Sequence, residues 1–239
     1  MKKTFLDLGN QPLANNFSKK YFPPVFRLKL KFDKKSKLVM INKHIRKERM
    51  FNNSYPYRSS KSKLVEKLFK NLSQRIKKKL RPKNILEIGC NDGTFASNFN
   101  KKIITCIEPC GEVAKEAKKK GLKVYIKYFD NLLVKKLISD HKKFDLIFSA
   151  NTITHISNYN SVFYNVSKIL SDNGTFIVEE PSLLETIKKN SYDQFYNEHI
   201  YVFSTIALQN NLKKNNLEIY DVENIKVHGG SNRYYIKKI

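Results

Sequence analysis

Two glycines and two acids near residue 90 are spaced as in a ligand-binding loop of an α/β protein. Glu87, Gly89 and Gly93 lie at the end of a short apolar run, and Asn91 stands between the glycines. Glycine lets the backbone turn sharply and approach a ligand, and asparagine tolerates positive φ better than most residues. Glu108 ends a second apolar run about 20 residues later, where doubly wound folds place an acid on ribose hydroxyls. The spacing therefore predicts a site for a ribose-containing ligand.

The loop differs from two common phosphate-binding loops. The dinucleotide fingerprint requires glycines at 89, 91 and 94, whereas this chain has Gly89, Asn91 and Thr94. No Lys-Ser or Lys-Thr pair follows, which excludes a P-loop. The pattern resembles motif I of class I S-adenosylmethionine-dependent methyltransferases, and this resemblance implies S-adenosylmethionine as the cofactor. A nicotinamide-type Rossmann domain or a loop without a ligand is the alternative.

Composition limits the class of protein. A chain of 239 residues with 41% hydrophobic residues can form one core of ordinary size and a small appendage. No apolar run reaches the roughly 18 residues of a membrane span, and the N-terminus lacks the apolar centre of a signal peptide. We therefore expect a cytoplasmic protein without a membrane partner. The cysteines Cys90, Cys106 and Cys110 cluster around the glycine loop, which indicates reduced thiols and no zinc site.

The net charge of +25 has two interpretations. A polyanionic partner, most obviously RNA, would explain it. Alternatively, it reflects a lysine-rich proteome, because lysines are spread over predicted helix faces. Clusters at 77–79 and 118–120 end helices, where cations complement the helix dipole. We favour the second interpretation and keep nucleic acid as a secondary candidate partner.

The order of predicted elements indicates two parts. Residues 1–60 contain four prolines and alternate Phe26, Leu28, Leu30 and Phe32 at period two, which predicts a small β-type module on the substrate side. Residues 61–239 alternate helices and strands and end in a Gly-Gly hairpin. This order predicts a doubly wound, Rossmann-like α/β sheet with a C-terminal antiparallel hairpin. Strands are expected near 84–88, 103–108, 123–129, 144–151, 175–180, 217–227 and 232–238. Helices are expected at 61–80, after Gly93, near 113–120, from the third strand to about 138, and near 159–170, 181–189 and 204–214.

Ligands in such sheets bind outside the carboxyl ends of the strands. Asp130 would accept a hydrogen bond from the adenine amine, with Phe129 against the ring, and Asn151 would face the methionine part. The expected cofactor-binding residues are Glu87, Gly89, Asn91, Gly93, Glu108, Pro109, Phe129, Asp130 and Asn151.

A second stretch, 191–204, is aromatic and not periodic, and it contains Glu198 and His199. Packing alone explains such a loop poorly. After the fourth predicted strand the chain reads Asn151-Thr-Ile-Thr-His155, without the prolines usual in amine methylases acting on bases. No cysteine follows Cys110, which removes a nucleophile for C5-methylation of pyrimidines. Both absences weaken the RNA interpretation.

The stretch Tyr196-Asn-Glu198-His199, with Phe203-Ser204 and Val227-His-Gly-Gly-Ser231 after it, resembles the sugar C-methyltransferases that act on nucleotide-linked 4-keto-deoxysugars. Segments 8–17 and 55–62 resemble the same family, so the likeness spans nearly the whole chain. Members of that family hold zinc through cysteine pairs in the N-terminal module, but residues 1–89 contain no cysteine. Members also continue into a further domain that helps to enclose the sugar nucleotide, whereas this sequence stops at Ile239.

The resemblance implies methylation of a carbon next to a ketone. That reaction needs a base and a group that stabilises the enolate oxygen. His199 is the expected base, and Glu198 would orient it or bind a sugar hydroxyl. Tyr196 and His155 would donate to the enolate oxygen or hold the ring, and Tyr57 would reach the cavity from the N-terminal module. The alternatives are an RNA-binding methyltransferase and a non-catalytic S-adenosylmethionine-binding relic.

Overall fold

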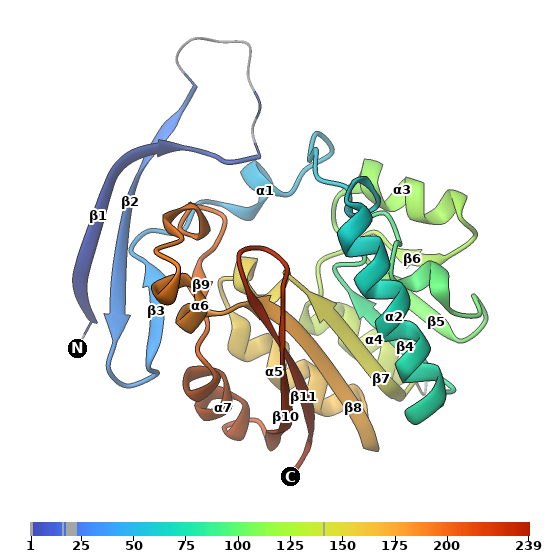
Figure 1. Ribbon diagram of the computed structural model, residues 1–239. Helices are drawn as coiled ribbons and strands as arrows, with labels where there is room; N and C mark the ends of the chain where they lie inside the picture. Colours follow the sequence, from blue (N-terminus) through green and yellow to red (C-terminus); the bar gives the residue numbers. More distant parts are fainter. Residues whose placement is uncertain (1, 16, 18–22, 141) are drawn as a thin grey trace.

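The computed structural model describes residues 2–15, 17, 23–140 and 142–239. It contains two sheets (Figure 1). The larger sheet has the strand order β10-β11-β8-β7-β4-β5-β6, and its central part is parallel. The strands are β4 (Ile85–Ile88), β5 (Ile104–Ile107), β6 (Lys123–Tyr125), β7 (Phe144–Ala150), β8 (Leu170–Pro181), β10 (Leu217–Ile225) and β11 (Ser231–Lys238). The last two pair antiparallel, so the predicted α/β fold class and its terminal hairpin are confirmed.

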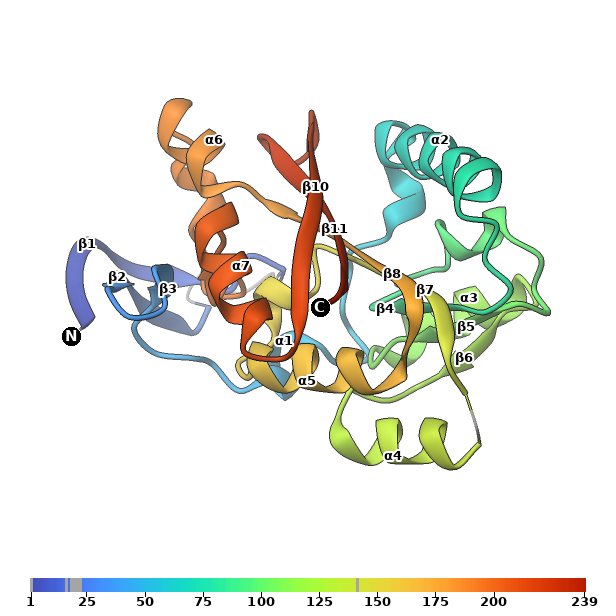
Figure 2. The same cartoon turned by 90° about the horizontal axis from the view of Figure 1, so that it is seen from below.

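Helices cover both faces of the larger sheet. Figure 2 shows α2 on one side and α4 and α5 on the other. The helices are α1 (Lys47–Met50), α2 (Lys63–Lys79), α3 (Gly111–Lys119), α4 (Asn131–Ser139), α5 (Tyr159–Ile169), α6 (Leu183–Lys188) and α7 (Thr205–Lys213). Short 3-10 helices are η1 (Ser59–Lys61), η2 (Ala96–Asn98), η3 (Ile153–His155) and η4 (Tyr192–Gln194).

The apolar pattern of β4 explains the two core layers. Ile85 packs with residues of α2 and α3, whereas Leu86 and Ile88 face the side of α4 and α5. Successive side chains of a strand point to opposite faces, so one short apolar run serves both layers. This arrangement fixes the glycine loop at the carboxyl end of β4, in the centre of the sheet.

The smaller sheet is built from distant parts of the sequence. Its order is β1-β2-β3-β9, with β1 (Lys2–Pro12), β2 (Val25–Asp33), β3 (Leu38–Ile41) and β9 (Tyr201–Val202). β9 lies in the stretch predicted as a loop, and it pairs Val39 with Val202 and Met40 with Tyr201. The aromatic stretch is therefore joined to the N-terminal β-type module that the alternating pattern predicted.

Three predicted boundaries were wrong. The predicted helix after Gly93 is reduced to the single 3-10 turn η2. The third strand ends at Tyr125, four residues earlier than predicted. β8 begins at Leu170 rather than Thr175, because Leu170 pairs with Phe144 of β7; an irregularity follows, and the regular pairing resumes at Thr175. Among the described residues, no helix is both long and apolar enough to cross a membrane.

Candidate active site

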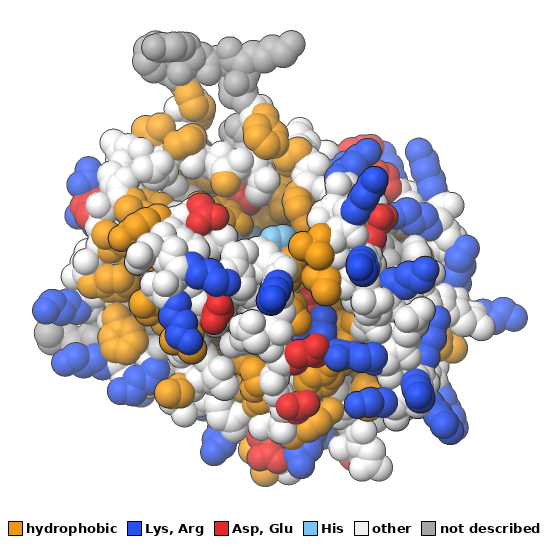
Figure 3. Space-filling view, in the orientation of Figure 1, with side chains coloured by type: hydrophobic (Ala, Val, Ile, Leu, Met, Phe, Trp, Pro, Cys, Tyr) orange, Lys and Arg blue, Asp and Glu red, His pale blue; other side chains and the backbone are white. Residues whose placement is uncertain are grey.

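A cavity of about 750 Å³ lies at the carboxyl ends of β4, β5 and β7, under the segment that carries α1. In the space-filling view a histidine is visible inside a hollow of the surface (Figure 3). Most of the predicted site residues line this cavity: Tyr57, Gly89, Asn91, Glu108, Pro109, Phe129, Asp130, Asn151, His155, Tyr196 and His199. The fold thus brings together residues that are up to 142 positions apart in the sequence, Tyr57 and His199.

Glu108 is held in the cavity wall by the backbone. Its carboxylate accepts hydrogen bonds from the backbone N–H of Asn91 at 2.9 Å and of Cys110 at 2.9 Å. Burial raises the pKa of Glu108 above its ordinary value. Because two fixed donors orient the carboxyl group, it can present its remaining lone pairs to hydroxyl groups in the cavity.

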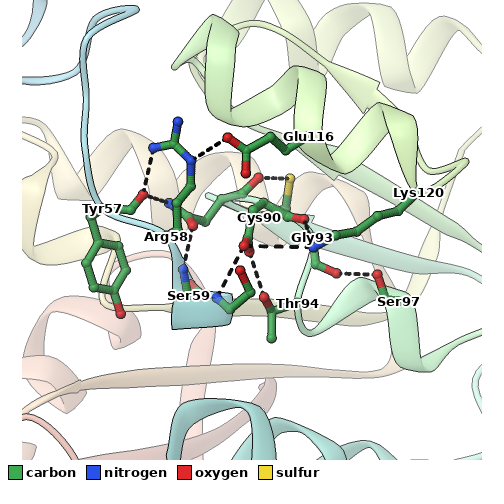
Figure 4. A network of polar contacts seen from close by, with 12 residues as sticks. Tyr57, Arg58, Ser59, Cys90, Gly93, Thr94, Ser97, Glu116 and Lys120 are labelled. Carbon is green, nitrogen blue, oxygen red and sulfur yellow. Dashed lines mark hydrogen bonds and ion pairs between the residues drawn. The ribbon is translucent and has the colours of Figure 1, made fainter. Parts of the chain in front are cut away.

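The glycine loop is bound to the segment before α2 (Figure 4). Asn91, at φ 52°, accepts from the backbone N–H of Ser59 through Oδ1 at 2.8 Å and donates to the Tyr57 carbonyl through Nδ2 at 3.2 Å. Arg58 forms an ion pair with Glu116 on α3 at 2.7 Å. These bonds place the Tyr57 side chain beside the loop. Sequence reasoning singled out the 55–62 segment but did not predict that Asn91 would anchor it.

Two predicted cofactor residues lie outside the cavity. Glu87 is buried in β4 and surrounded by the core, and its burial raises its pKa well above the ordinary value. Gly93, at φ +79°, packs closely against Leu122 and Ala117. The structure therefore gives both residues a part in shaping the loop, without a contact to the cavity.

His199 and Tyr196 form a hydrogen-bonded pair in the wall. The Nδ1 atom of His199 lies 3.0 Å from the carbonyl oxygen of Gln194, and its Nε2 atom lies 2.5 Å from the Tyr196 hydroxyl. A carbonyl only accepts, so Nδ1 carries the proton in the neutral ring and Nε2 accepts from the hydroxyl. Burial lowers the pKa of His199 well below its ordinary value, and His155 lowers it further. The ring is thus a neutral, unprotonated base.

His155 stands against His199, with ring centroids 5.1 Å apart. Its Nδ1 atom lies 2.8 Å from the backbone carbonyl oxygen of Glu198, so the one N–H group of the neutral ring donates to that oxygen. Glu180 fixes the turn that carries His155: its Oε1 accepts from the backbone N–H of Ile153 at 2.8 Å and from those of two neighbours, Thr152 and Thr154. Sequence reasoning placed Glu180 at a strand end but did not predict this contact.

Glu198 does not face His199, although a role in orienting that ring was expected. Its carboxylate accepts from the backbone N–H of Asn15 at 2.9 Å and from the Asn15 side chain at 2.5 Å. Burial raises the pKa of Glu198. Glu198 is not among the residues that line the cavity, whereas Asn15 lines it. Asn15 belongs to the N-terminal module and was not among the predicted site residues. Its position depends on a contact between residues 183 positions apart, which no local pattern shows.

Residues 57–222 match the family described as "Methyltransferase domain". The chain belongs to this methyltransferase family. Over 149 residues it is 28% identical to the C-methyltransferase NovU of Streptomyces niveus. That match covers 62% of the chain and 36% of the relative, so the chain corresponds to only about a third of the relative's length.

Solved structures support the same fold for this methyltransferase. It resembles an S-adenosylmethionine-dependent methyltransferase of Clostridium acetobutylicum, with TM-score 0.57 and 16% identity over 75% of this chain and 93% of that one. A second similar structure is a magnesium protoporphyrin IX methyltransferase of Synechocystis, solved with bound S-adenosylhomocysteine. The TM-score is 0.55, with 12% identity over 73% of this chain and 83% of that one. The cofactor of the chain is S-adenosylmethionine.

The cavity of the methyltransferase fits this cofactor. Glu108 offers acceptor sites suited to ribose hydroxyls, and Phe129 and Asp130 line the cavity beyond β6. Asn151, at φ 48°, also lines it, and its buried Oδ1 has no partner in the described part of the chain. Such an atom needs a donor. The ammonium group of the methionine part would supply one.

Replacing Gly89 by alanine should abolish cofactor binding by the methyltransferase. Gly89 has φ +73°, and an added Cβ would collide with the Thr152 side chain at the cavity wall. Gly9 is a matched control, because it has the same φ of +73° with no atom within 4 Å of an added Cβ. We expect Gly9→Ala to cost roughly 1 kcal/mol of unfolding free energy and Gly89→Ala roughly 3 kcal/mol. Calorimetric titration should show a loss of S-adenosylmethionine affinity for Gly89→Ala alone; equal affinities would contradict the assigned contact.

The stability of the methyltransferase should depend on the protonation of His155. Burial lowers the pKa of His155 from its ordinary 6.5 to about 4. Between these values the unfolded chain binds a proton that the folded chain does not. The stabilisation by neutral His155 is therefore complete above pH 6.5 and is lost as the pH is lowered toward 4. The unfolding free energy lost in His155→Gln should therefore shrink by about 1–2 kcal/mol from about pH 7.5 to about pH 5.

Urea denaturation of both proteins at the two pH values measures this difference. Burial raises the pKa of Glu180 to about 8, so Glu180 makes the unfolding free energy rise as the pH is lowered. This effect is present in both proteins and cancels in their difference. A pH-independent difference would show that His155 titrates at its ordinary value in the folded state.

Proposed function

We propose that this methyltransferase transfers a methyl group to a carbon next to the ketone of a nucleotide-linked deoxysugar. The observation that carries the proposal is the hydrogen-bonded pair of half-buried Tyr196 and buried, neutral His199 in the cavity wall. The likeness to a protein named as a C-methyltransferase supports it. Carbon is not nucleophilic until a proton is removed, and a neutral imidazole in a buried wall is suited to that step.

The tautomer of His199 defines the path of the proton. Nδ1 stays bonded to the Gln194 carbonyl, so Nε2 is the atom that gains a proton. The Tyr196 hydroxyl gives its proton to Nε2 as its oxygen takes the proton from the substrate carbon. The carbon–hydrogen pair of electrons remains on the substrate as an enolate, and His199 becomes the imidazolium.

The enolate oxygen needs a donor in the same cavity. His155 does not suit this role, because its N–H is directed at the Glu198 carbonyl. Tyr57 also lines the cavity, and burial raises its pKa, so its hydroxyl keeps its proton. We assign Tyr57 as the donor. Bound S-adenosylmethionine supplies the electrophilic methyl group, and the protein contributes mainly its alignment with the carbanion.

We also assign a positioning role to residues 1–60 as a substrate-side module. Asn15 holds the Glu198 carboxylate, and β3 pairs with β9 directly after His199. The N-terminal module thereby contacts the segment that presents Tyr196 and His199 at Glu198, within it, and at β9, just after it. Residues 61–239 would supply the cofactor site.

Radiolabelled S-adenosylmethionine with three acceptors tests the proposed function. We expect label in a 4-keto-6-deoxysugar nucleotide, and none in the same nucleotide after reduction of the ketone to an alcohol or in bulk RNA. Label in RNA would favour the alternative suggested by the net charge of +25. Cofactor binding without transfer to any acceptor would indicate a non-catalytic relic.

A further inference from the structure

A second groove of about 570 Å³ lies beside the reaction cavity, on the side of the smaller sheet. Its walls come from β2, from the chain after β3 and from the start of α5. His44, Ser157 and Asn158 line both spaces. The cavity and the groove are therefore neighbours, and a molecule bound in the cavity needs to pass only these three residues to reach the groove.

The size of the reaction cavity favours such an extension. Its volume of about 750 Å³ lies within the range of 300–1,000 Å³ that holds one drug-sized ligand. Cofactor and sugar together occupy a space of that size. Any further part of the acceptor must then lie beyond the cavity, and the groove adjoins it at His44.

The groove and the neighbouring cavity each carry a cationic side chain for which the described residues show no ion pair. Lys31 lines the groove and Arg46 lines the cavity, and within the described residues the structure shows no ion pair or hydrogen bond for either side chain. Two carboxylates lie nearby: Asp33 accepts from the Ser36 hydroxyl at 2.7 Å, and Glu48 is exposed beside Arg46. Lys47 packs over the ring of Tyr128 at 3.7 Å, away from the groove. Lys31 and Arg46 therefore remain to contact an anion.

Asn42 adds a polar contact. Its Oδ1 is buried and has no partner among the described residues, and Asn42 lines the groove. A buried acceptor without a donor indicates a ligand or water that supplies one. Hydroxyl groups of a ribose or an N–H of a base are donors of the right kind.

Resting on the proposed function, we propose that this groove binds the nucleoside diphosphate part of the acceptor. Arg46 and Lys31 contact the diphosphate, and Asn42 accepts from the nucleoside. The sugar then lies in the reaction cavity beside Tyr196 and His199. Arginine suits this role because its planar guanidinium binds phosphate oxygens in pairs.

Binding of thymidine diphosphate and uridine diphosphate, measured by calorimetry without any turnover, tests the groove. S-adenosylhomocysteine is present at saturation, so that the adenine site is filled. We expect Arg46→Ala and Lys31→Ala each to weaken binding about tenfold, because a charge-assisted hydrogen bond is lost. Arg49→Ala is the matched control, since Arg49 is exposed on the same segment and lines neither space. Binding of thymidine, which lacks phosphates, should not change in any variant.

Three results would overturn the assignment: no binding of either diphosphate, loss of binding on adding S-adenosylhomocysteine, or equal effects of Arg46→Ala and Arg49→Ala. If diphosphate binding depends on Arg46 and Lys31 but a 4-keto-6-deoxysugar nucleotide receives no methyl group, the proposed function is refuted and the groove remains assigned.

Discussion

Replacing His199 with asparagine is expected to slow exchange of the proton next to the substrate ketone by roughly 10³-fold, within the range for general base catalysis. The asparagine amide can still donate to the Gln194 carbonyl, but it cannot take a proton as Nε2 does. The measurement is incorporation of deuterium from heavy water into a 4-keto-6-deoxysugar nucleotide, followed by NMR. Affinity for S-adenosylmethionine should stay unchanged.

Tyr192→Phe is the matched control for this variant. Tyr192 lies in the same aromatic stretch and is 60% exposed, so its hydroxyl is far from any buried proton path. Exchange in Tyr192→Phe should equal that of the unchanged protein. Full exchange in His199→Asn would exclude His199 as the base.

Replacing Arg233 with alanine is expected to lower the unfolding free energy by roughly 3–5 kcal/mol. Arg233 and Glu179 lie on adjacent strands, both side chains are 3% exposed, and Nε lies 2.6 Å from Oε1. Removing the guanidinium leaves a buried carboxylate without its countercharge. Glu223, which accepts from the same guanidinium at 2.8 Å, loses a partner as well. Urea denaturation measures the loss.

The exposed ion pair of Arg75 and Glu223, which shares Glu223 with Arg233, provides the control. Arg75 pairs with Glu223 at 2.6 Å, but it is 46% exposed, so Arg75→Ala should cost less than about 1 kcal/mol. Because an apolar pair can replace a buried ion pair at little cost, Arg233→Met with Glu179→Leu should recover most of the stability. Similar losses in Arg233→Ala and Arg75→Ala would show that burial does not amplify this interaction.

Local patterns predicted the parts of the fold that depend on local rules. Periodicity or turn chemistry accounts for the apolar run before Gly89, the apolar stripe of the helix at 61–80 and the Gly-Gly hairpin. These three features predicted the sheet and the edge of it at which the cofactor binds. The helix after Gly93 was wrong because Phe95 and Phe99 are used as core residues around the short turn η2, with Phe95 stacked on Phe148 at 3.8 Å. A pattern of apolar residues does not distinguish that packing from a helix.

Contacts between distant segments could not be predicted. The Glu198 side chain was expected beside that of His199, but its carboxylate accepts hydrogen bonds from Asn15 of the N-terminal module. β9 has only two residues, and only its pairing with β3 makes it a strand. Similarly, the contact of Glu180 with the turn at 152–154 joins the ends of two neighbouring strands. In each case the partner is fixed by the assembled fold.

Transfer of a carbon-13 methyl group from S-adenosylmethionine to a 4-keto-6-deoxysugar nucleotide tests the central claim most directly. Carbon–carbon couplings in the NMR spectrum of the product reveal the atom that received the label. The base formed by Tyr196 and His199 predicts a methyl group bonded to the carbon next to the ketone. A methyl group on oxygen or nitrogen would contradict it.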